Sequence, residues 1–323
     1  MKAKILITGG NGFIGASLAQ YLNTVPEYSV HVTVRSKKEG SLAKYNVHEV
    51  ADIDSSFNWA AVLDGVDCIV HTAGQAHILT PGVVSLESFR RINTYGTLNL
   101  ARQAAKAGVR RFVFISSIGV NGARTFSAPF SEDSEVNPHA DYALSKYEAE
   151  QGLIELSKES AMEIVIIRPP LVYAAHAPGN FQRLLKIVYS KLPLPFGSIH
   201  NSRSMIALEN LVSFIAQCIR HPKAANELFL VADGMDLSIS DIVRYLSDGM
   251  NRRNRLLFIP EVLLKRAALL VGKEGMYIQL CGSLTIDAKK SRECLDWSPP
   301  VTPKDALLNI GREYSIKRAD LTN

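Results

Sequence analysis

The chain opens with a short apolar run followed by a glycine-rich segment. Residues Lys4–Thr8 read KILIT, and glycines follow at positions 9, 12 and 15. The segment Ile14–Leu22, which includes the last of these glycines, has helical spacing of its apolar residues. Glycines at this spacing permit a tight turn (Gly9), close approach of a phosphate to backbone N–H groups (Gly12) and close helix packing (Gly15). We therefore expect a dinucleotide-binding loop, with a purely structural turn as the alternative.

Short apolar runs alternate with longer helical patterns through the first half of the chain. Continuous apolar strands separated by helices indicate a parallel sheet that is covered on both faces. The sequence therefore predicts an α/β fold with a Rossmann-type doubly wound parallel sheet. The expected strands are Lys4–Thr8, Val30–Val34, Cys68–His71, Arg111–Ile115, Glu163–Ile167 and Glu227–Val231, and the expected longer helices are Ile14–Leu22, Arg90–Ala107 and Tyr142–Leu156.

The alternation breaks at Pro169 and Pro170, and the chain from about Asp236 onward is helical and rich in loops. We expect a dinucleotide-binding domain of residues 1–173 plus about 206–235. A smaller, mostly helical C-terminal substrate lobe would comprise about 174–205 plus 236–323. The segment Val262–Val271, with its basic residues, is expected as a helix packed on that lobe, and a position on a membrane surface is the alternative.

Composition excludes several classes of protein. The net charge of +5 over 323 residues is mild and scattered, which argues against a nucleic-acid partner. No run approaches 18 uninterrupted apolar residues, so we expect no membrane span. The four cysteines lack CxxC spacing, which predicts neither a metal site nor a disulfide scaffold. We expect a cytoplasmic protein.

The residues after the second expected strand bear on the choice of dinucleotide. An acidic residue there would bind the adenosine ribose hydroxyls, but the sequence places Arg35, Ser36 and Lys38 at this point. A guanidinium, a hydroxyl and an ammonium group suit a 2′-phosphate. NADP(H) is therefore favoured, NAD(H) is possible, and a solvated basic turn is the alternative.

A second group of residues suggests acid–base chemistry. Tyr142 and Lys146 are four residues apart and share one helix face. A nearby ammonium group would stabilise the phenolate and bring the pKa of the tyrosine closer to neutrality. Ser117 stands at the carboxyl end of the expected strand Arg111–Ile115, the edge where parallel sheets bind ligands. Its hydroxyl could bond a substrate carbonyl while Tyr142 supplies the proton.

These motifs together resemble the extended short-chain dehydrogenase/reductase superfamily, and more narrowly its nucleotide-sugar epimerase/dehydratase/reductase family. The resemblance spans nearly the whole chain. It rests on the glycine loop, the HTAG segment 71–74, Asn93, the SSIGVNG segment 116–122, Tyr142 with Lys146, the RPPLVY segment 168–173, Asn180, the RSMIALENL segment 203–211 and the DWSPP segment 296–300.

The resemblance implies a role for each matching residue and a homodimer packed through Arg90–Ala107 and Tyr142–Leu156. Two departures, Asn121 and Ala174-Ala175, are expected to alter the sugar-facing wall and the following loop. The implied catalytic residues are Ser117, Tyr142 and Lys146. The implied substrate-binding residues are Ser117, Asn180 and Arg203. The implied cofactor-binding residues are Gly9, Gly12, Phe13, Ile14, Gly15, Arg35, Ser36, Lys38, Asp52, Ile53, Thr72, Ala73, Gly74, Asn93, Tyr142, Lys146 and Pro169.

The basic residue Arg35 favours an exchangeable, reduced cofactor. Our first hypothesis is therefore NADPH-dependent reduction of the 4-keto group of a UDP-4-keto-6-deoxy-N-acetylhexosamine, a UDP-sugar used for surface polysaccharide. The alternative is a UDP-hexose 4-epimerase, acting on UDP-glucose or UDP-N-acetylglucosamine, that uses the same residues. A non-catalytic dinucleotide sensor is a remote alternative, since fold alone does not establish activity.

Overall fold

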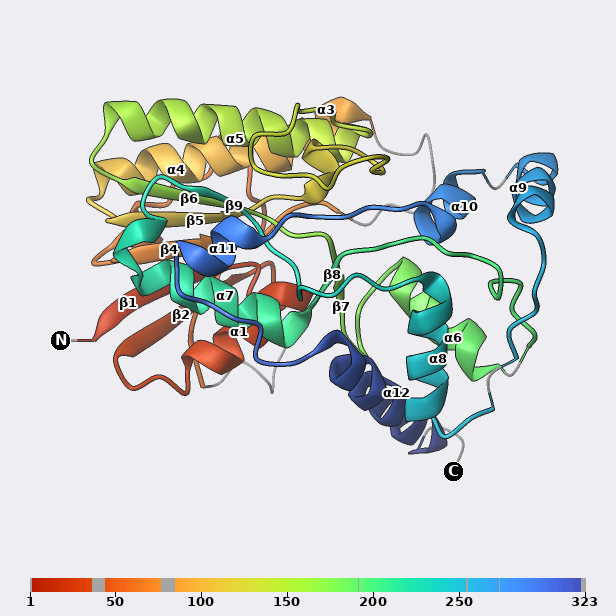
Figure 1. The fold of residues 1–323 in the computed structure, drawn as a ribbon. Helices are drawn as coiled ribbons and strands as arrows, with labels where there is room; N and C mark the ends of the chain where they lie inside the picture. The colour runs from red at the N-terminus through yellow and green to blue at the C-terminus, as the bar shows by residue number, and fades with distance from the viewer. Residues whose placement is uncertain are drawn as a thin grey trace.

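The computed structural model describes residues 2–36, 44–76, 85–190, 192–253, 255–272 and 274–320. Its centre is a seven-stranded sheet in which every neighbouring pair of strands is parallel (Figure 1). The strand order is β3-β2-β1-β4-β5-β6-β9, which confirms the predicted doubly wound fold. The strands are β1 (Ala3–Thr8), β2 (Tyr28–Val34), β3 (Asn46–Glu49), β4 (Cys68–His71), β5 (Arg111–Ile115), β6 (Glu163–Arg168) and β9 (Leu228–Leu230).

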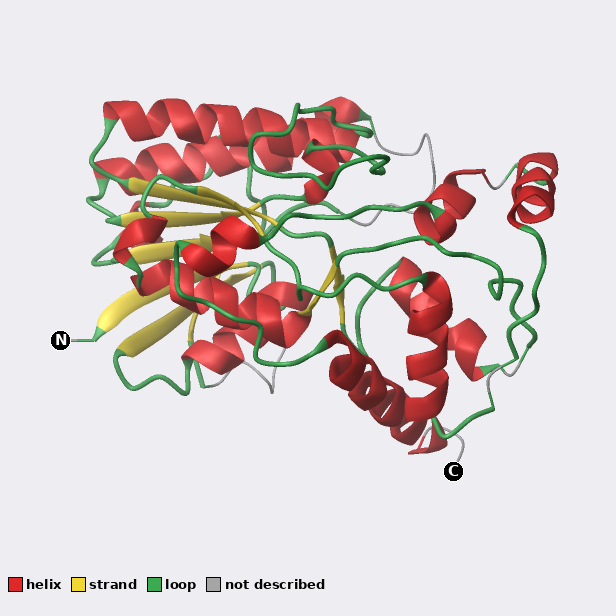
Figure 2. Cartoon of the chain, in the orientation of Figure 1, coloured by secondary structure: helices red, strands yellow, loops and turns green. Residues whose placement is uncertain are grey.

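Helices cover both faces of this sheet, because its central strands are apolar on both sides (Figure 2). One face packs against α1 (Phe13–Leu22) and α7 (Leu208–Arg220). The other face packs against α2 (Ala60–Leu63), α4 (Thr97–Lys106) and α5 (Asp141–Glu159). The carboxyl ends of β1, β4, β5 and β6 therefore meet at one edge, where the predicted motif residues follow them.

A second apolar core lies beside the sheet. It surrounds the parallel strand pair β7 (Leu171–Tyr173) and β8 (Met205–Ala207) and the inner faces of three helices. These helices are α6 (Asn180–Tyr189), α8 (Ile239–Gly249) and α12 (Pro303–Asp320). The division into a dinucleotide domain and a substrate lobe stays a prediction. The boundary is not simple, however, since Leu295 and Trp297 pack into the core of the sheet.

The helix predicted over Arg90–Ala107 is interrupted. The structure has a short helix, α3 (Leu86–Phe89), then a π-helical stretch over Arg90–Gly96, and then α4. Such stretches are rare and often occur at functional sites. Here the wider turn contains Asn93, whose side chain is fully buried and bonded to two other segments. Tertiary contacts thus decide the local helix type.

The C-terminal region adds three further helices. They are α9 (Glu261–Leu270), α10 (Glu274–Cys281) and α11 (Lys289–Glu293). The expectation that Val262–Val271 packs on the lobe is met only in part, because no described residue of α9 is buried. Figure 1 shows this helix at the end of the molecule farthest from the sheet.

One buried guanidinium ties the sheet to α7. Arg111, at the start of β5, is 1% exposed and pairs with Glu163 at 2.7 Å. Its Nη1 also donates to the carbonyl oxygens of Cys218, Ile219 and His221 at 2.6–3.0 Å. The Cys218 and Ile219 carbonyls belong to the last turn of α7, so the arginine caps the helix and complements its dipole, while the His221 carbonyl also accepts from the Ala224 N–H at 3.1 Å.

Replacing Arg111 by Ala should lower the free energy of unfolding by about 3 kcal/mol, because it leaves buried carbonyls without their donor and removes the buried partner of Glu163. Urea unfolding measures the change. Arg110→Ala is the matched control, since Arg110 is exposed and lies 3.4 Å from the same Glu163; it should cost no more than about 0.5 kcal/mol. Equal losses in the two variants would contradict the capping role.

Candidate functional site

The glycine loop follows β1 and leads directly into α1. Gly9 has φ +72°, a backbone conformation that favours glycine, and its carbonyl accepts a hydrogen bond from the Gly12 N–H at 2.8 Å. A Cβ on Gly15 would collide with the Gly9 carbonyl and lie 2.7 Å from Thr72 Oγ1. The N-cap Gly12 offers no side chain to the first-turn N–H groups of α1. An uncapped helix N-terminus of this kind fits a phosphate group.

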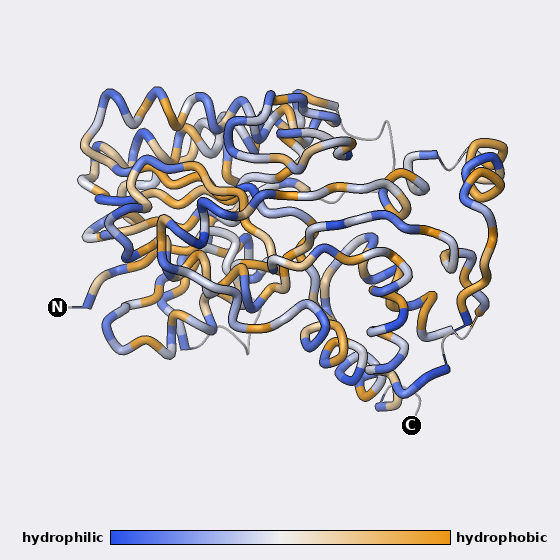
Figure 3. Tube along the Cα trace, viewed as in Figure 1, coloured by the Kyte–Doolittle hydropathy of each residue, from blue (hydrophilic) through white to orange (hydrophobic). Residues whose placement is uncertain are grey.

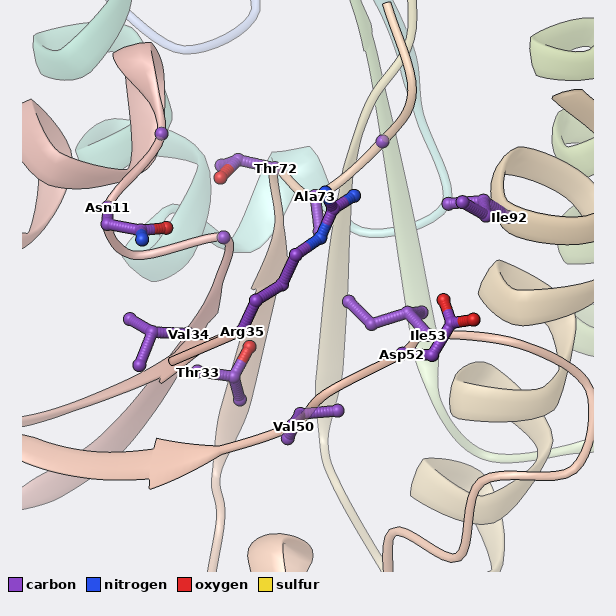
Figure 4. Close-up of a pocket in the computed structure, with 13 residues that line it drawn as sticks. Asn11, Thr33, Val34, Arg35, Val50, Asp52, Ile53, Thr72, Ala73 and Ile92 are labelled. Atoms are coloured by element: carbon purple, nitrogen blue, oxygen red, sulfur yellow. The ribbon is translucent and has the colours of Figure 1, made fainter. Parts of the chain in front are cut away.

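A pocket of about 350 Å³ opens beside this loop (Figure 4). It brings together eight of the predicted cofactor-binding residues from four separate segments. Val34, Val50 and Ile92 add apolar walls that sequence reasoning missed, since single aliphatic residues carry no motif. The lining residues are Gly9, Asn11, Gly12, Thr33, Val34, Arg35, Val50, Asp52, Ile53, Thr72, Ala73, Gly74 and Ile92.

Charged side chains mark one end of this pocket. Arg35 follows β2, is exposed, and extends along the pocket in Figure 4. Asp52 pairs with Arg91 at 2.5 Å, so its carboxylate already has a cation. Ser36 is exposed and does not line the described pocket, and Lys38 lies outside the described residues.

The side chains of Phe13 and Ile14, two predicted cofactor-binding residues, are not among those lining the described pocket. Both side chains pack against the apolar core rather than line the described pocket. The Phe13 ring also meets His176 edge to face, with centroids 5.3 Å apart. A contact with a dinucleotide would therefore come from their backbone N–H groups at the start of α1.

Asn93 connects the first pocket to α5. Its side-chain nitrogen donates to the Gln75 carbonyl and to Ser145 Oγ, both at 3.1 Å, and its oxygen accepts from the Gln75 N–H at 2.8 Å. A Cβ on Gly74 would lie 3.1 Å from Asn93 Oδ1 and 3.3 Å from Lys146 Nζ. Gly74, Asn93 and Lys146 are thus adjacent, as the predicted shared site requires.

Lys146 is buried and held in a defined position. Its Nζ donates to the Ile115 carbonyl at 3.0 Å and lies 4.5 Å from the centre of the Phe114 ring. Burial lowers the pKa of Lys146 to about 8, against a smaller raising effect from Glu150. The ammonium group is therefore close to titration near neutral pH.

Tyr142 departs from the sequence expectation. Burial raises the pKa of Tyr142 to about 12, whereas a neighbouring Lys146 was expected to lower it. The reason is that desolvation disfavours the phenolate, while the Lys146 ammonium is bonded to a backbone carbonyl. The Tyr142 ring packs edge-on against Phe89 at 6.2 Å. Among the described residues, neither Tyr142 nor Lys146 lines this first pocket. Neither of them lines a second pocket, which contains Ser117.

Ser117 lies just past the end of β5. Its extended backbone caps a short 3₁₀ turn, Ile118–Val120, and its Oγ accepts from the Gly119 N–H at 3.1 Å. The carbonyl of the buried Pro169 accepts from the Ile118 N–H at 3.0 Å. The Pro169 backbone thereby fixes the turn that carries Ser117.

A buried polar network behind Ser117 was not predicted. Glu150 on α5 forms an ion pair with Arg168 at 2.5 Å and accepts a short hydrogen bond from Ser116. Arg168 also donates to Asn121 Oδ1 at 3.0 Å. Asn121 was expected to alter the sugar-facing wall, but its side chain is buried behind the turn and is not among the described residues that line the pocket containing Ser117. Neighbouring Gly122 lines the second pocket instead.

The second pocket, of about 300 Å³, collects all three predicted substrate residues. Ser117 comes from the sheet edge, Asn180 from α6, and Arg203 from the segment before β8. Sequence reasoning missed His139, Gln279 and several apolar residues because they come from distant segments. The lining residues are Ser117, Ile118, Gly119, Gly122, Ala123, His139, Pro170, Leu171, Asn180, Phe181, Leu184, Arg203, Met205, Ile239, Ile242, Gln279, Leu280 and Leu284.

Arg203 carries the charge of this pocket. Its Nη1 donates to the Gly282 carbonyl at 2.8 Å, and no carboxylate among the described residues forms an ion pair with it. Burial lowers the pKa of Arg203, with a smaller raising effect from Cys281. Asn180 lies across the pocket and donates to Gln279 Oε1 at 2.6 Å. A largely desolvated guanidinium without an anion is a strong attractor for one.

Comparison with known proteins identifies the family. A sequence profile described as "NAD dependent epimerase/dehydratase family" matches residues 5–232. The chain belongs to this family. The match confirms the resemblance seen in the sequence and the prediction that the chain is an enzyme.

Individual relatives agree with the family assignment. A UDP-glucose 4-epimerase from Vibrio cholerae is 42% identical over 320 residues, covering 97% of this chain and 96% of the relative. A Thermotoga maritima UDP-glucose 4-epimerase solved with UDP-glucose has a TM-score of 0.78 at 21% identity, over 98% of this chain and 99% of that one. A Bacillus cereus UDP-glucuronic acid 4-epimerase solved with NAD has a TM-score of 0.78 at 21% identity, over 98% of both chains.

The structure also bears on membrane insertion. Across the described ranges, no helix is long and apolar enough to cross a membrane.

The lowered pKa of Lys146 predicts how the free energy of unfolding depends on pH. Its folded-state pKa of about 8 lies below the ordinary value of 10.5, so the unfolded chain binds more protons between these values. Stability should therefore rise with pH in this window. Relative to Lys146→Met, the wild type should gain about 2 kcal/mol in free energy of unfolding between pH 7.5 and 9.5.

Urea unfolding at the two pH values measures this gain. Lys158→Met, at the exposed end of the same helix, is the control and should track the wild type. Parallel pH slopes for the wild type and Lys146→Met would contradict the burial of the ammonium group.

Proposed function

We propose that this member of the family is a UDP-hexose 4-epimerase, interconverting the C4 epimers of UDP-glucose or UDP-N-acetylglucosamine. The observation that carries the proposal is the second pocket, where the Ser117 hydroxyl and the Arg203 guanidinium face one cavity. The name of the Vibrio cholerae relative supports epimerisation over the reduction that the sequence first suggested. Solved structures of similar fold are also titled as UDP-sugar 4-epimerases.

Arg203 is the proposed partner of the sugar-nucleotide diphosphate. The guanidinium has a neutral backbone carbonyl as its partner in the described structure, so an anion would gain a charge-assisted hydrogen bond without displacing a carboxylate. Asn180 and Gln279, bonded to each other across the pocket, can orient the same ligand. The sugar would then extend toward Ser117 at the sheet edge.

The first pocket fits a nicotinamide dinucleotide. The uncapped N-terminus of α1 and the glycine cradle would hold the pyrophosphate. The apolar walls Val50 and Ile92 would enclose the adenine, beside Ile53. When bound, this cofactor supplies the ring that accepts the C4 hydride of the sugar and returns it.

Three side chains would take part in proton transfer to and from the C4 oxygen. Ser117 donates a hydrogen bond to that oxygen, and Tyr142 takes and returns its proton. With a pKa of about 12, Tyr142 is a phenol at neutral pH, the form that donates to a carbonyl oxygen. Taking the proton from the C4 hydroxyl needs the phenolate, and a Lys146 ammonium turned from the Ile115 carbonyl toward Tyr142 would stabilise it. Lys146 would also hold the nicotinamide ribose beside Gly74.

Reduction with NADPH is the second candidate, and one observation favours it. Arg35 lines the adenosine end of the first pocket, and no acid follows β2 where a ribose-binding carboxylate would stand. A dinucleotide with a 2′-phosphate would suit this residue. Two structures of similar fold, a UDP-glucuronic acid 4-epimerase and a dTDP-glucose 4,6-dehydratase, were solved with NAD.

The two candidates differ in whether the reaction consumes a reductant. We expect purified protein with NAD to interconvert UDP-glucose and UDP-galactose, or the N-acetylated pair, with no net change in reduced-nicotinamide absorbance. Chromatography of the UDP-sugars measures this. Absence of interconversion, with stoichiometric loss of NADPH on a UDP-4-keto-6-deoxy-N-acetylhexosamine, would establish the reductase instead.

The same assay tests the proton carrier. Tyr142→Phe should lower kcat by about 10²- to 10⁴-fold, because it removes the acid–base group. Tyr147→Phe, on the next turn of α5, is the matched control and should keep activity within about twofold, as a surface change does. Equal activity of Tyr142→Phe and the wild type would remove Tyr142 from the mechanism.

A further inference from the structure

The helix α9 presents its apolar residues to solvent. Val262 is 61% exposed and Leu270 is 88% exposed, and Leu263, Leu269 and Val271 are also exposed. Figure 3 shows this segment as a hydrophobic stretch of the trace at the edge of the molecule. An apolar residue alone on a surface is ordinary, but a contiguous set of this kind marks an interaction site.

The outer face of α9 is more apolar than that of a normal surface helix. Leu264, one of its two less exposed residues, packs against the core of the lobe, and Ala268 lies one turn further on the same face. At 100° per residue, the opposite face carries Val262, Leu269 and Leu270, with Arg266 among them. A helix that needed only to stay in water would place polar residues at most of these positions.

The preceding loop extends the apolar surface. Phe258 is 79% exposed and Leu257 is 48% exposed, close in sequence to the start of α9. A large aromatic side chain with this exposure loses much of the burial free energy available to it. We call the exposed residues of α9 and this loop the α9 patch; its apolar members are Leu257, Phe258, Val262, Leu263, Leu269, Leu270 and Val271.

Basic side chains accompany the α9 patch. Lys265 and Arg266 on α9 are exposed, as are Arg253 and Arg255 in the loop before it. The acidic residue of the helix, Glu261, accepts a hydrogen bond from Tyr277 on α10 at 2.8 Å. The α9 patch therefore combines apolar side chains with positive charge, as interfacial helices do.

We propose that the α9 patch docks on an anionic membrane surface, with its apolar side chains among the acyl chains and its basic residues at the headgroups. Each Lys or Arg near such a surface contributes about 1 kcal/mol, and the apolar side chains add their burial free energy. The inference does not depend on the proposed function, because it uses no residue of either pocket.

A second copy of the chain fits this surface less well. A two-fold interface places the same patch on both sides, so the basic residues of both copies would be gathered in one interface. Helix α9 is also only about 15 Å long, whereas a stable interface buries about 800 Å² on each partner. Charge and size thus both favour a lipid surface.

Docking would also place the second pocket close to the membrane. Helix α10 follows α9 in the chain, and its residues Gln279 and Leu280 line that pocket. The pocket wall and the α9 patch therefore belong to neighbouring segments of one lobe.

Flotation with lipid vesicles tests the proposal on the full chain. We expect the protein to bind vesicles of phosphatidylcholine with 30% phosphatidylglycerol at least about tenfold more strongly than neutral phosphatidylcholine vesicles, and less at high salt. The double variant Lys265→Glu/Leu270→Glu should lose at least about tenfold in binding.

The matched control is Lys317→Glu/Ile316→Glu on α12, which changes an exposed basic residue and a 64% exposed apolar residue elsewhere. It should bind vesicles as the wild type does, and thermal melting should show that both variants are folded. Absence of anionic-vesicle binding, or equal binding by the α9 variant, would overturn the proposal. A change in oligomeric mass of the α9 variant without vesicle binding would assign the patch to a second copy instead.

Discussion

The ion pair between Glu150 and Arg168 fixes the position of α5 on the sheet. Both side chains are almost completely buried, and the pair joins the helix to the carboxyl end of β6. Glu150 also bonds Ser116 at the end of β5, one residue before Ser117. Because Tyr142 and Lys146 lie on the same helix, this network sets their distance from the sheet edge. Breaking such a pair would leave an unpaired buried charge. The pair therefore holds α5 in one position, although it adds little net free energy of folding.

Two features of the site attract anions, one in each pocket. The first is the uncapped N-terminus of α1, where backbone groups and glycines leave room for a pyrophosphate. The second is Arg203, whose guanidinium is desolvated in the other pocket without a carboxylate partner in the described structure. Gly74, close to Lys146, lines the first pocket, and Ser117 lines the second. The arrangement suits a dinucleotide and a sugar nucleotide that meet at the edge of the sheet.

The sequence predicted the parts of this site that depend on local patterns. The glycine loop, the strand before Ser117 and the helix carrying Tyr142 and Lys146 follow from apolar periodicity and residue spacing. The π-helical turn at Asn93 and the raised pKa of Tyr142 do not, because tertiary hydrogen bonds and burial create them. Arg203 was expected from resemblance, but that no described carboxylate forms an ion pair with it is visible only in three dimensions. The outward apolar face of α9 likewise contradicts the rule that such faces turn inward.

In the proposed function, Arg203 of the second pocket recognises the diphosphate of the sugar nucleotide. Calorimetry of UDP and of uridine, with NAD in excess, measures this recognition in the wild type and in Arg203→Met. We expect the wild type to bind UDP about 10- to 100-fold more tightly than uridine, as a hydrogen bond to a charged group implies, and Arg203→Met to lose most of that difference. Equal affinities for the two ligands in the wild type, or an unchanged preference in Arg203→Met, would contradict the claim.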